Sequence, residues 1–302
     1  MLHVKEIIMF KIVVDSACNL TEDLLKEYDI EVISFKCTID GEEYVCYEEG
    51  RDDQADGKWF YDKIREGADV KTSLISPGDI VDRLSVYLEN GYDVLFTCMS
   101  AKLTGTYQSA LVAKESLEED FPDRKIIMVD SMGASFGEGL LCIEASKMRK
   151  TGAGIDEVYK WIVDNRLRMR HIFTVDDLQY LKKGGRISQV ENIIGSILNI
   201  KPLLYASDEA KIDKLATVRG RKKSLDALVN DYVKYAYEPE KQTIAIAHCD
   251  CKEEALYIAD KINELRPPKE LIIRVYDRCS GTHVGPGALC IFFMGKDRGY
   301  ED

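Results

Sequence analysis

A continuous apolar run over residues 94–99 is the feature that most constrains the fold, because it ends abruptly in a hydroxyl-rich loop that leads into a helical segment. Such a run is typical of a buried strand in a sheet that is covered on both faces. Hydroxyl groups follow other strand-like segments at Thr72, Ser73 and Ser131. Ligands of open α/β sheets bind outside the carboxyl ends of the strands, so we expect these loops to share one site.

Strand-like and helix-like segments alternate through the first half of the chain. Thr21 offers a hydroxyl cap before two acidic residues, and Pro77 fits the first turn of a helix. We expect helices that begin at these two residues, further helices over 59–65, 106–118 and 138–150, and strands over 12–14, 31–39, 93–99 and 125–130. This alternation predicts a largely parallel sheet with helices on both faces.

The pattern changes after a glycine-containing linker at residues 151–154. We expect a strand at 172–175 between two helices, helices over 193–200, 221–236 and 252–265, an antiparallel pair formed by 202–205 and 211–218, and strands over 243–247, 270–276 and 288–293. These strands predict a mixed sheet. We therefore interpret the chain as an α/β protein of two domains, residues 1–153 and 154–302, with the ligand between them. Residues 1–10 are a candidate extension.

Charge and hydropathy argue against several classes of protein. A formal net charge of -12 and a sequence pI of about 5.0 argue against nucleic-acid binding, which needs a basic surface. No window approaches the roughly 18 apolar residues of a membrane helix, so we expect no stable membrane insertion. The nine cysteines are scattered through strand-like and helix-like segments, which is typical of reduced thiols in a cytoplasmic protein.

Residues 133–137 match the G-x-S-x-G pattern of a nucleophile elbow, with Ser135 in the place of the nucleophile. In that arrangement the serine follows its strand directly, whereas here residues 130–132 intervene. A serine esterase or thioesterase that uses Ser135 or Ser100 with His283 is the alternative function. The structural interpretation of the same segment is a glycine loop that lets the backbone approach a ligand or another segment.

Signals for a metal or a nucleotide are weak. Cys249 and Cys251 stand beside His248, but a closed metal site needs four ligands. The glycine-rich phosphate loops of nucleotide-binding proteins are absent from the sequence, and residues 15–18 follow the first strand instead. We therefore expect neither a metal nor a cofactor.

Three basic features are ambiguous when each is taken alone. His283 lies in the glycine-rich segment 281–287, which predicts a rigid turn, and its imidazole can either bond a carboxylate or be satisfied by backbone. Arg186 follows two glycines and is either an anion contact or a surface arginine. The cluster at 219–223 is either a solvated helix start or a contact for an acidic partner.

Eight short segments stand in a characteristic order: 14–16, 71–73, 100–110, 130–131, 178–188, 201–202, 219–223 and 281–287. In this order they resemble the DegV family of bacterial fatty-acid-binding proteins, which includes the acyl-binding subunit of the bacterial fatty acid kinase. Each segment alone is weakly informative. Their joint order over almost the whole chain from Lys11 onwards is specific.

The resemblance implies a non-catalytic, two-domain α/β protein that buries one long-chain fatty acid and holds its carboxylate by hydroxyl groups and a histidine. The ligand-binding residues expected by motif position are Thr72, Ser73, Ser100, Thr104, Gly105 and His283. A separate kinase catalytic subunit would phosphorylate the bound acid. The candidate contacts with that subunit, or with the acyl-phosphate, are Arg186, Arg219 and Arg221.

The chain departs from the family pattern in two places. Ala101 and Thr104 stand where the family has serines, and residues 74–76 read Leu-Ile-Ser rather than Gln-Pro-Ser. A hydrogen bond to the carboxylate is then lost or moved to Thr104. Burying an acyl chain contributes roughly 0.8 kcal/mol per methylene, so an apolar tunnel would supply affinity and the polar groups orientation. A binding module for another small anion is a third hypothesis.

Overall fold

The apolar run at Val94 forms the strand β6 (Asp93–Cys98), every residue of which is buried. The structure is a computed structural model that describes residues 9–186 and 199–300. β6 lies in a four-stranded sheet, here sheet A, whose order is β2-β1-β6-β7 and whose neighbours are all parallel. The other strands are β1 (Phe10–Asp15), β2 (Ile30–Ile33) and β7 (Ile126–Asp130). The predicted parallel N-terminal sheet is confirmed.

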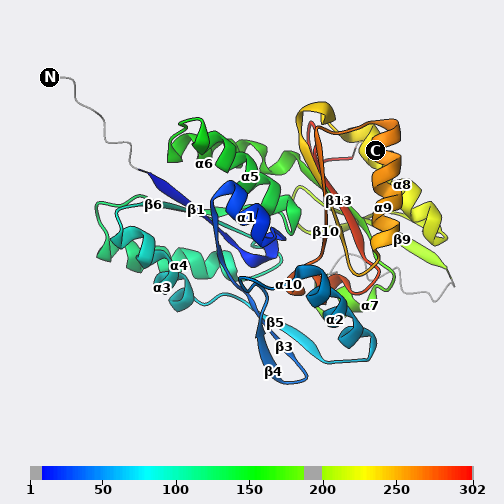
Figure 1. Ribbon diagram of the computed structural model, residues 1–302, viewed down its shortest axis with the longest axis horizontal. Helices are drawn as coiled ribbons and strands as arrows, with labels where there is room; N and C mark the ends of the chain where they lie inside the picture. The colour runs from blue at the N-terminus through cyan, green and yellow to red at the C-terminus, as the bar shows by residue number, and fades with distance from the viewer. Residues whose placement is uncertain (1–8, 187–198, 301–302) are drawn as a thin grey trace.

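Helices cover both faces of sheet A (Figure 1). On one face lie α3 (Pro77–Glu89) and α4 (Thr106–Asp120), and on the other α1 (Glu22–Tyr28), α5 (Phe136–Lys150) and α6 (Ile155–Asn165). Ser76 and Asp79 form a capping box at the start of α3, with Pro77 in its first turn. At α1 the predicted cap bond is not formed, because the Thr21 hydroxyl donates to the Asp23 carboxylate instead.

A second sheet, here sheet C, has the order β10-β9-β8-β13-β11-β12. Its strands are β8 (Met169–Thr174), β9 (Ile200–Ala206), β10 (Ile212–Arg219), β11 (Thr243–His248), β12 (Glu270–Val275) and β13 (Leu289–Met294). Only β11 and β12 pair in parallel, so the predicted mixed sheet is confirmed. α8 (Arg221–Tyr235) and α9 (Lys252–Leu265) pack on one face and α5 on the other, which places α5 between sheets A and C.

The prediction of a single strand over residues 31–39 is wrong. β2 ends at Ile33, and β3 (Lys36–Ile39) belongs to a third sheet, here sheet B, of order β4-β3-β5 with β4 (Glu42–Val45) and β5 (Val70–Ser73). The Phe35 N–H donates to the Ser16 hydroxyl, and the Ser34 hydroxyl accepts from the Tyr47 N–H. Between β2 and β3, serine hydroxyl groups therefore accept backbone hydrogen bonds that a neighbouring strand would otherwise accept. The chain leaves sheet A and enters sheet B at this point.

Three short helices surround sheet B. α2 (Asp53–Arg65) packs against β12, while α7 (Gln179–Lys183) and α10 (Arg278–Val284) pack against each other. Most of the predicted helix over 193–200 lies outside the described residues, and its last residue, Ile200, begins β9. The domain boundary at 153/154 stays a prediction; α6, which follows it, packs against α5 and sheet A.

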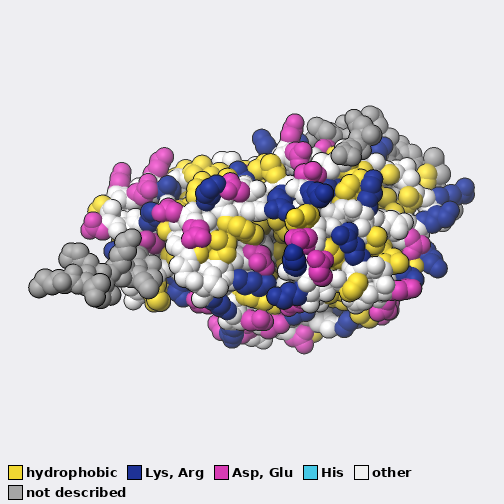
Figure 2. Space-filling model, turned by 90° about the horizontal axis from the view of Figure 1, so that it is seen from above, with side chains coloured by type: hydrophobic (Ala, Val, Ile, Leu, Met, Phe, Trp, Pro, Cys, Tyr) yellow, Lys and Arg dark blue, Asp and Glu magenta, His cyan; other side chains and the backbone are white. Residues whose placement is uncertain are grey.

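The described surface carries interspersed charges. On the face shown in Figure 2, acidic and basic side chains alternate, and no broad basic area gathers among the described residues there. Within residues 9–186 and 199–300, no helix is both long and apolar enough to cross a membrane.

Candidate functional site

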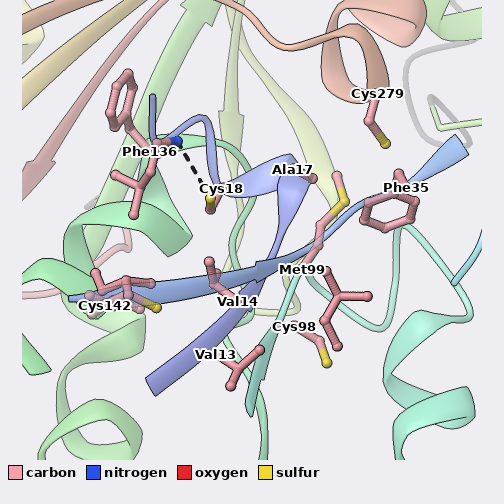
Figure 3. Packing of buried hydrophobic residues seen from close by; sticks show 14 of the residues in the cluster. Val13, Val14, Ala17, Cys18, Phe35, Cys98, Met99, Phe136, Cys142 and Cys279 are labelled. Carbon is pink, nitrogen blue, oxygen red and sulfur yellow. Dashed lines mark hydrogen bonds between the residues drawn. The ribbon is translucent and has the colours of Figure 1, made fainter. Parts of the chain in front are cut away.

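A cavity of about 270 Å³ lies where the three sheets meet. Its walls come from Phe35 directly before β3, from β5, from the loops that follow β6 and β7, and from α10 and sheet C. Apolar lining residues include Phe35, Met99, Met132, Phe173, Tyr276 and Phe292. In Figure 3 the Cys279 side chain extends from α10 towards Phe35, with Met99 close by. The cavity is therefore mainly apolar and is built from segments that are far apart in the sequence.

Polar groups gather at one end of this cavity, here called the polar end. It is lined by Thr72, Ser73, Thr104, Gly105, Arg186 and His283. The Thr72 Oγ1 atom on β5 lies 2.9 Å from the Nε2 atom of His283 on α10. A second surface opening of about 260 Å³ shares Thr72, Arg186 and His283 and adds Lys71 and Lys183. The polar end is thus the part of the cavity that faces solvent.

His283 lies in a helix rather than in the rigid turn predicted for residues 281–287. The Asp277 carboxylate accepts from the Ser280 N–H and caps α10, and Gly285, with a φ of 76°, ends it. The three glycines therefore predict a turn, whereas the cap at Asp277 starts a helix that includes Gly281 and ends before Gly285. This helix holds the imidazole against β5.

Burial and, to a smaller extent, the positive charge of Arg186 lower the pKa of His283 to about 4. The imidazole is therefore neutral at neutral pH. Its Nδ1 atom is buried and has no partner among the described residues. A Cβ atom at Gly184 would overlap this Nδ1 atom, so the glycine before Arg186 lets the ring pack against the backbone. His283 thus brings to the polar end a ring nitrogen that forms no hydrogen bond with the described residues.

Arg186 joins two walls of the polar end. Its Nε atom donates to the Leu103 carbonyl at 3.2 Å, and its Nη1 atom donates to the Gly184 carbonyl. Arg186 therefore lies in the same part of the cavity as Thr72 and His283, the residues predicted to bind the carboxylate. Arg219 is exposed on β10, and Arg221 is held by Glu254 and by the Gly287 carbonyl. Neither Arg219 nor Arg221 lines the cavity.

The loop after β6 contributes fewer hydroxyl groups to the cavity than the sequence predicted. The buried Ser100 hydroxyl donates to the Ala210 carbonyl and accepts from the Lys102 N–H, and Ser100 does not line the cavity. Thr104 does line it, with Oγ1 3.1 Å from the Thr106 hydroxyl. Gly105 adjoins Leu74, since a Cβ atom there would lie 3.1 Å from a Leu74 methyl group. Thr104 is thus the loop hydroxyl placed to meet a ligand.

The opposite end of the cavity, here called the inner end, is formed around Ser135 and His171. The His171 Nε2 atom accepts from the Ala134 N–H at 3.3 Å, and its Nδ1 atom lies 3.0 Å from the Met169 carbonyl. Burial, aided by the charge of Arg298, lowers its pKa well below the usual value. Both ring nitrogens are therefore used by backbone, and the ring offers the cavity only carbon atoms.

The serine–histidine pairs of the alternative function are not formed. Ser135 lines the inner end and its buried hydroxyl has no partner among the described residues, while Ser100 is bonded to backbone. His283 is bonded to Thr72 at the polar end. A nucleophilic serine needs a base within hydrogen-bonding distance, and neither serine has one.

Cys249, Cys251 and His248 are held by local contacts at the end of β11. The Cys251 thiol donates to the Ala288 carbonyl, and the His248 Nδ1 atom accepts from the Cys251 N–H. The described parts of the chain contain no group of three or more His, Cys, Asp or Glu side chains that could hold a metal.

Asp15 and His171 shape the cavity but were not among the site residues predicted from the sequence. Asp15 accepts from the N–H groups of Ala17 and Met99, and so fixes the turn after β6 against the end of β1. Burial raises the pKa of this carboxyl group to about 7. The available signal was its place directly after the first strand. His171 had no comparable signal, because it stands inside a strand.

Comparison with known proteins identifies the family. The family model described as "Uncharacterised protein, DegV family" matches residues 9–296. A DegV domain-containing protein of Clostridium perfringens is 41% identical over 289 residues, which are 96% of this chain and 98% of that protein. The chain belongs to the DegV family.

Solved structures of DegV proteins share the fold. A DegV lipid-binding protein of Thermotoga maritima aligns with a TM-score of 0.83 and 29% identity, over 96% of this chain and 100% of its own. A DegV protein of Thermus thermophilus, described by its fatty acid binding, aligns with a TM-score of 0.84 and 25% identity, over 95% and 99% of the two chains. The predicted fold class is therefore confirmed as that of DegV proteins.

Proposed function

We propose that this DegV protein binds one long-chain fatty acid in the cavity, with the carboxylate at the polar end and the acyl chain running towards the inner end. The observation that carries the proposal is the division of a single cavity into a polar end near solvent and an apolar remainder. Its volume of about 270 Å³ is close to the lower limit of roughly 300 Å³ for small-molecule pockets. The related lipid-binding and fatty-acid-binding structures support the same ligand class.

The polar end can hold a carboxylate by charge-assisted hydrogen bonds. Thr72 offers a hydroxyl donor, His283 a ring N–H, and Arg186 a positive charge. Thr104 supplies a further hydroxyl from the loop after β6. Because the ring of His283 is partly buried and neutral without a ligand, an anion beside it favours its protonated form and raises its pKa.

The apolar lining supplies the affinity. Each methylene group that moves from water into the cavity contributes roughly 0.8 kcal/mol, so a long chain gains far more from burial than a short one. Ser135 and His171 bring polar atoms to the inner end, but both nitrogens of His171 are already bonded to backbone. The protein should therefore retain long-chain acids and release short ones.

The protein then acts as a non-catalytic carrier that presents the carboxylate to a separate kinase catalytic subunit. The surface opening beside Thr72 and His283 would give that subunit access to the head group. Lys71 and Lys183 at this opening both pair with Asp69, which leaves a net positive charge beside the head group. The proposal assigns the phosphoryl-transfer chemistry to the partner.

Native mass spectrometry of the purified full chain tests the binding proposal. We expect a population heavier than the chain by one long-chain fatty acid, which solvent extraction followed by lipid mass spectrometry identifies. After delipidation, the protein should rebind that acid with a stoichiometry of one. A protein that carries no lipid, and binds no long-chain acid at micromolar concentrations, would rule the proposal out.

A phosphorylation assay tests the carrier role separately. With a fatty acid kinase catalytic subunit and ATP, acyl-phosphate should form only when this chain holds the acid. Formation of the same product from free acid without this chain would contradict presentation while leaving fatty-acid binding intact.

A further inference from the structure

Three thiols gather behind the polar end. Cys37 lies on β3, Cys46 directly follows β4, and Cys279 lies on α10 and lines the cavity. All three are buried and free. α10 packs against β3, which brings Cys279 to the side of sheet B that carries Cys37. The proposed carrier role leaves this group of thiols without an assigned use.

The strand register places Cys37 and Cys46 on the same face of sheet B. Cys37 pairs with Tyr44, and the next N–H along that strand pair, that of Cys46, donates to the Phe35 carbonyl at 2.8 Å. Directly paired residues share a face, and residues two apart on one strand share it too. Cys37 and Cys46 are therefore diagonal neighbours. Each thiol shifts the pKa of the other through a side-chain hydrogen bond, as expected for diagonal neighbours on one face.

Two arginines give this thiol pair a positive environment. The Arg278 guanidinium bonds the Asp56 carboxylate and also contacts the Cys37 thiol. Arg51 donates to the Cys46 carbonyl. The hydrogen bond between the two thiols lowers the pKa of Cys37 and raises that of Cys46. Arg278 and Arg51 lower the pKa of Cys37 further, and burial opposes them. The two arginines therefore favour one thiolate, the reactive form of cysteine, within the hydrogen-bonded pair.

A small surface cleft leads to one of the two sulfur atoms. Cys46 lines it together with Arg51, Asp56 and Arg278. Cys37 lies behind Cys46 and is fully buried. A small oxidant that enters the cleft therefore reaches Cys46 first and finds Cys37 next to it.

We propose that Cys37 and Cys46 are a dithiol modification site, at which a small peroxide closes a disulfide between β3 and the end of β4. The Cys46 sulfur attacks one peroxide oxygen, the O–O bond breaks, and the leaving hydroxide takes the thiol proton, which gives a sulfenic acid and one water. The Cys37 sulfur then attacks the Cys46 sulfur, the S–O bond breaks, and the hydroxide leaves with the Cys37 proton as a second water. Two thiols are oxidised and one hydrogen peroxide molecule is reduced.

The disulfide would act on the carboxylate site, and this consequence rests on the proposed function. Cys37 pairs directly with Thr72 across β3 and β5, and Phe35 on the same side lines the cavity. A disulfide requires its two Cβ atoms to lie about 3.5–4.5 Å apart, closer than diagonal neighbours ordinarily stand. Closing it draws β3 towards the end of β4, and β3 is also paired with β5. The bond between Thr72 and His283 is therefore disturbed.

The full reduced chain, treated with an equimolar amount of hydrogen peroxide, tests the modification site. Digestion without reductant and mass spectrometry should give one cross-linked peptide pair that contains Cys37 and Cys46, with the loss of two hydrogen atoms. Cys37→Ser should stop at the sulfenic acid of Cys46, which a dimedone-type reagent traps. Cys142→Ser, a buried thiol of α5, is the matched control and should leave the cross-link unchanged.

Two results would overturn the site: a reduced Cys37 and Cys46 pair after peroxide treatment that oxidises other cysteines, or a cross-link that forms equally in Cys46→Ser. Thermal unfolding of the reduced variants shows whether each is folded. A folded Cys37→Ser protein without a trapped sulfenic acid at Cys46 also contradicts the proposed route.

Fatty-acid binding before and after oxidation tests the consequence. The oxidised protein should bind roughly threefold to tenfold more weakly, the size of one disturbed hydrogen bond, and a reductant should restore binding. Cys37→Ser should show no such peroxide response. If the cross-link forms and binding is unchanged, the link to the carboxylate site is wrong. If the reduced protein binds no fatty acid, the proposed function fails while the cross-link result stands.

Discussion

The two histidines at the ends of the cavity, His171 buried and His283 partly buried, are alike in charge and opposite in their bonding. Burial keeps both neutral at neutral pH, and both touch the same cavity. At the inner end, His171 has both nitrogens bonded to backbone. At the polar end, His283 has one nitrogen beside the Thr72 hydroxyl and the other without a partner among the described residues. A satisfied histidine stabilises the wall, whereas an unsatisfied one is available to a ligand.

The largest expected effect is on stability, at the inner end. A Cβ atom at Gly137 would overlap the His171 ring, so Gly137→Ala should lower the free energy of unfolding by about 3 kcal/mol. His171→Ala should cost a similar amount, because it leaves a cavity and two backbone groups unpaired. Urea unfolding measures both.

The double variant sharpens this result. With the ring removed, the added methyl group has room, so the two losses should fall short of additivity by roughly 1–3 kcal/mol. Strict additivity would show that the ring and Gly137 are not in contact.

The next effect is on affinity, at the polar end. His283→Ala and Thr72→Val should each weaken long-chain fatty-acid binding roughly tenfold or more, since each removes a hydrogen bond to a charged group. Their unfolding free energies should change less than that of His171→Ala. Isothermal titration of delipidated protein measures the affinity. An unchanged affinity in His283→Ala would show that His283, like His171, does not bind the ligand.

A pH titration separates the histidines by their response to ligand. His283 has a pKa of about 4, below the ordinary value near 6.5, so the folded protein favours its neutral form. Its contribution to stability is present above pH 6.5 and is lost as the pH falls towards 4. A bound carboxylate should raise the pKa of His283 and leave His171 neutral. Imidazole NMR signals recorded with and without fatty acid, and assigned with His283→Gln, check both expectations.

The smallest effect distinguishes two arginines. Arg186→Gln should weaken binding severalfold, more at low salt than at high salt, because it removes a positive charge from the polar end. Arg219→Gln, on the exposed side of β10, should leave affinity unchanged and is the matched control. Equal effects of the two variants would show that general surface charge, rather than a local contact, attracts the acid.

Short-range patterns predicted most of the fold. Apolar runs located β6, β7 and β11, and Pro77 located the start of α3. The error at residues 31–39 arose because two strands that lie two residues apart look like one, and hydroxyl groups elsewhere in the chain decide where the backbone leaves the sheet. The glycines at 281–287 hid a short helix for a related reason, since its cap depends on one aspartate.

The candidate site was predicted in part. The motifs named Thr72, Thr104 and His283, which the structure brings to one end of a cavity. They also named Ser100, whose hydroxyl bonds the Ala210 carbonyl 110 positions along the chain. A hydroxyl in a loop after a strand can serve a ligand or a distant carbonyl equally well. Only the distant partner distinguishes these uses.

By itself, the sequence determined the class of fold, most of the order of its strands and helices, and the motif positions that mark the family, because these depend on periodicity, capping and turn residues within a few positions. The tertiary structure decided which polar groups remain unsatisfied. The roles of His171 and His283 follow from partners at Ala134, Met169 and Thr72, which other elements bring into contact with them. Hydrogen bonding and burial are properties of the assembled walls, and no local pattern encodes them.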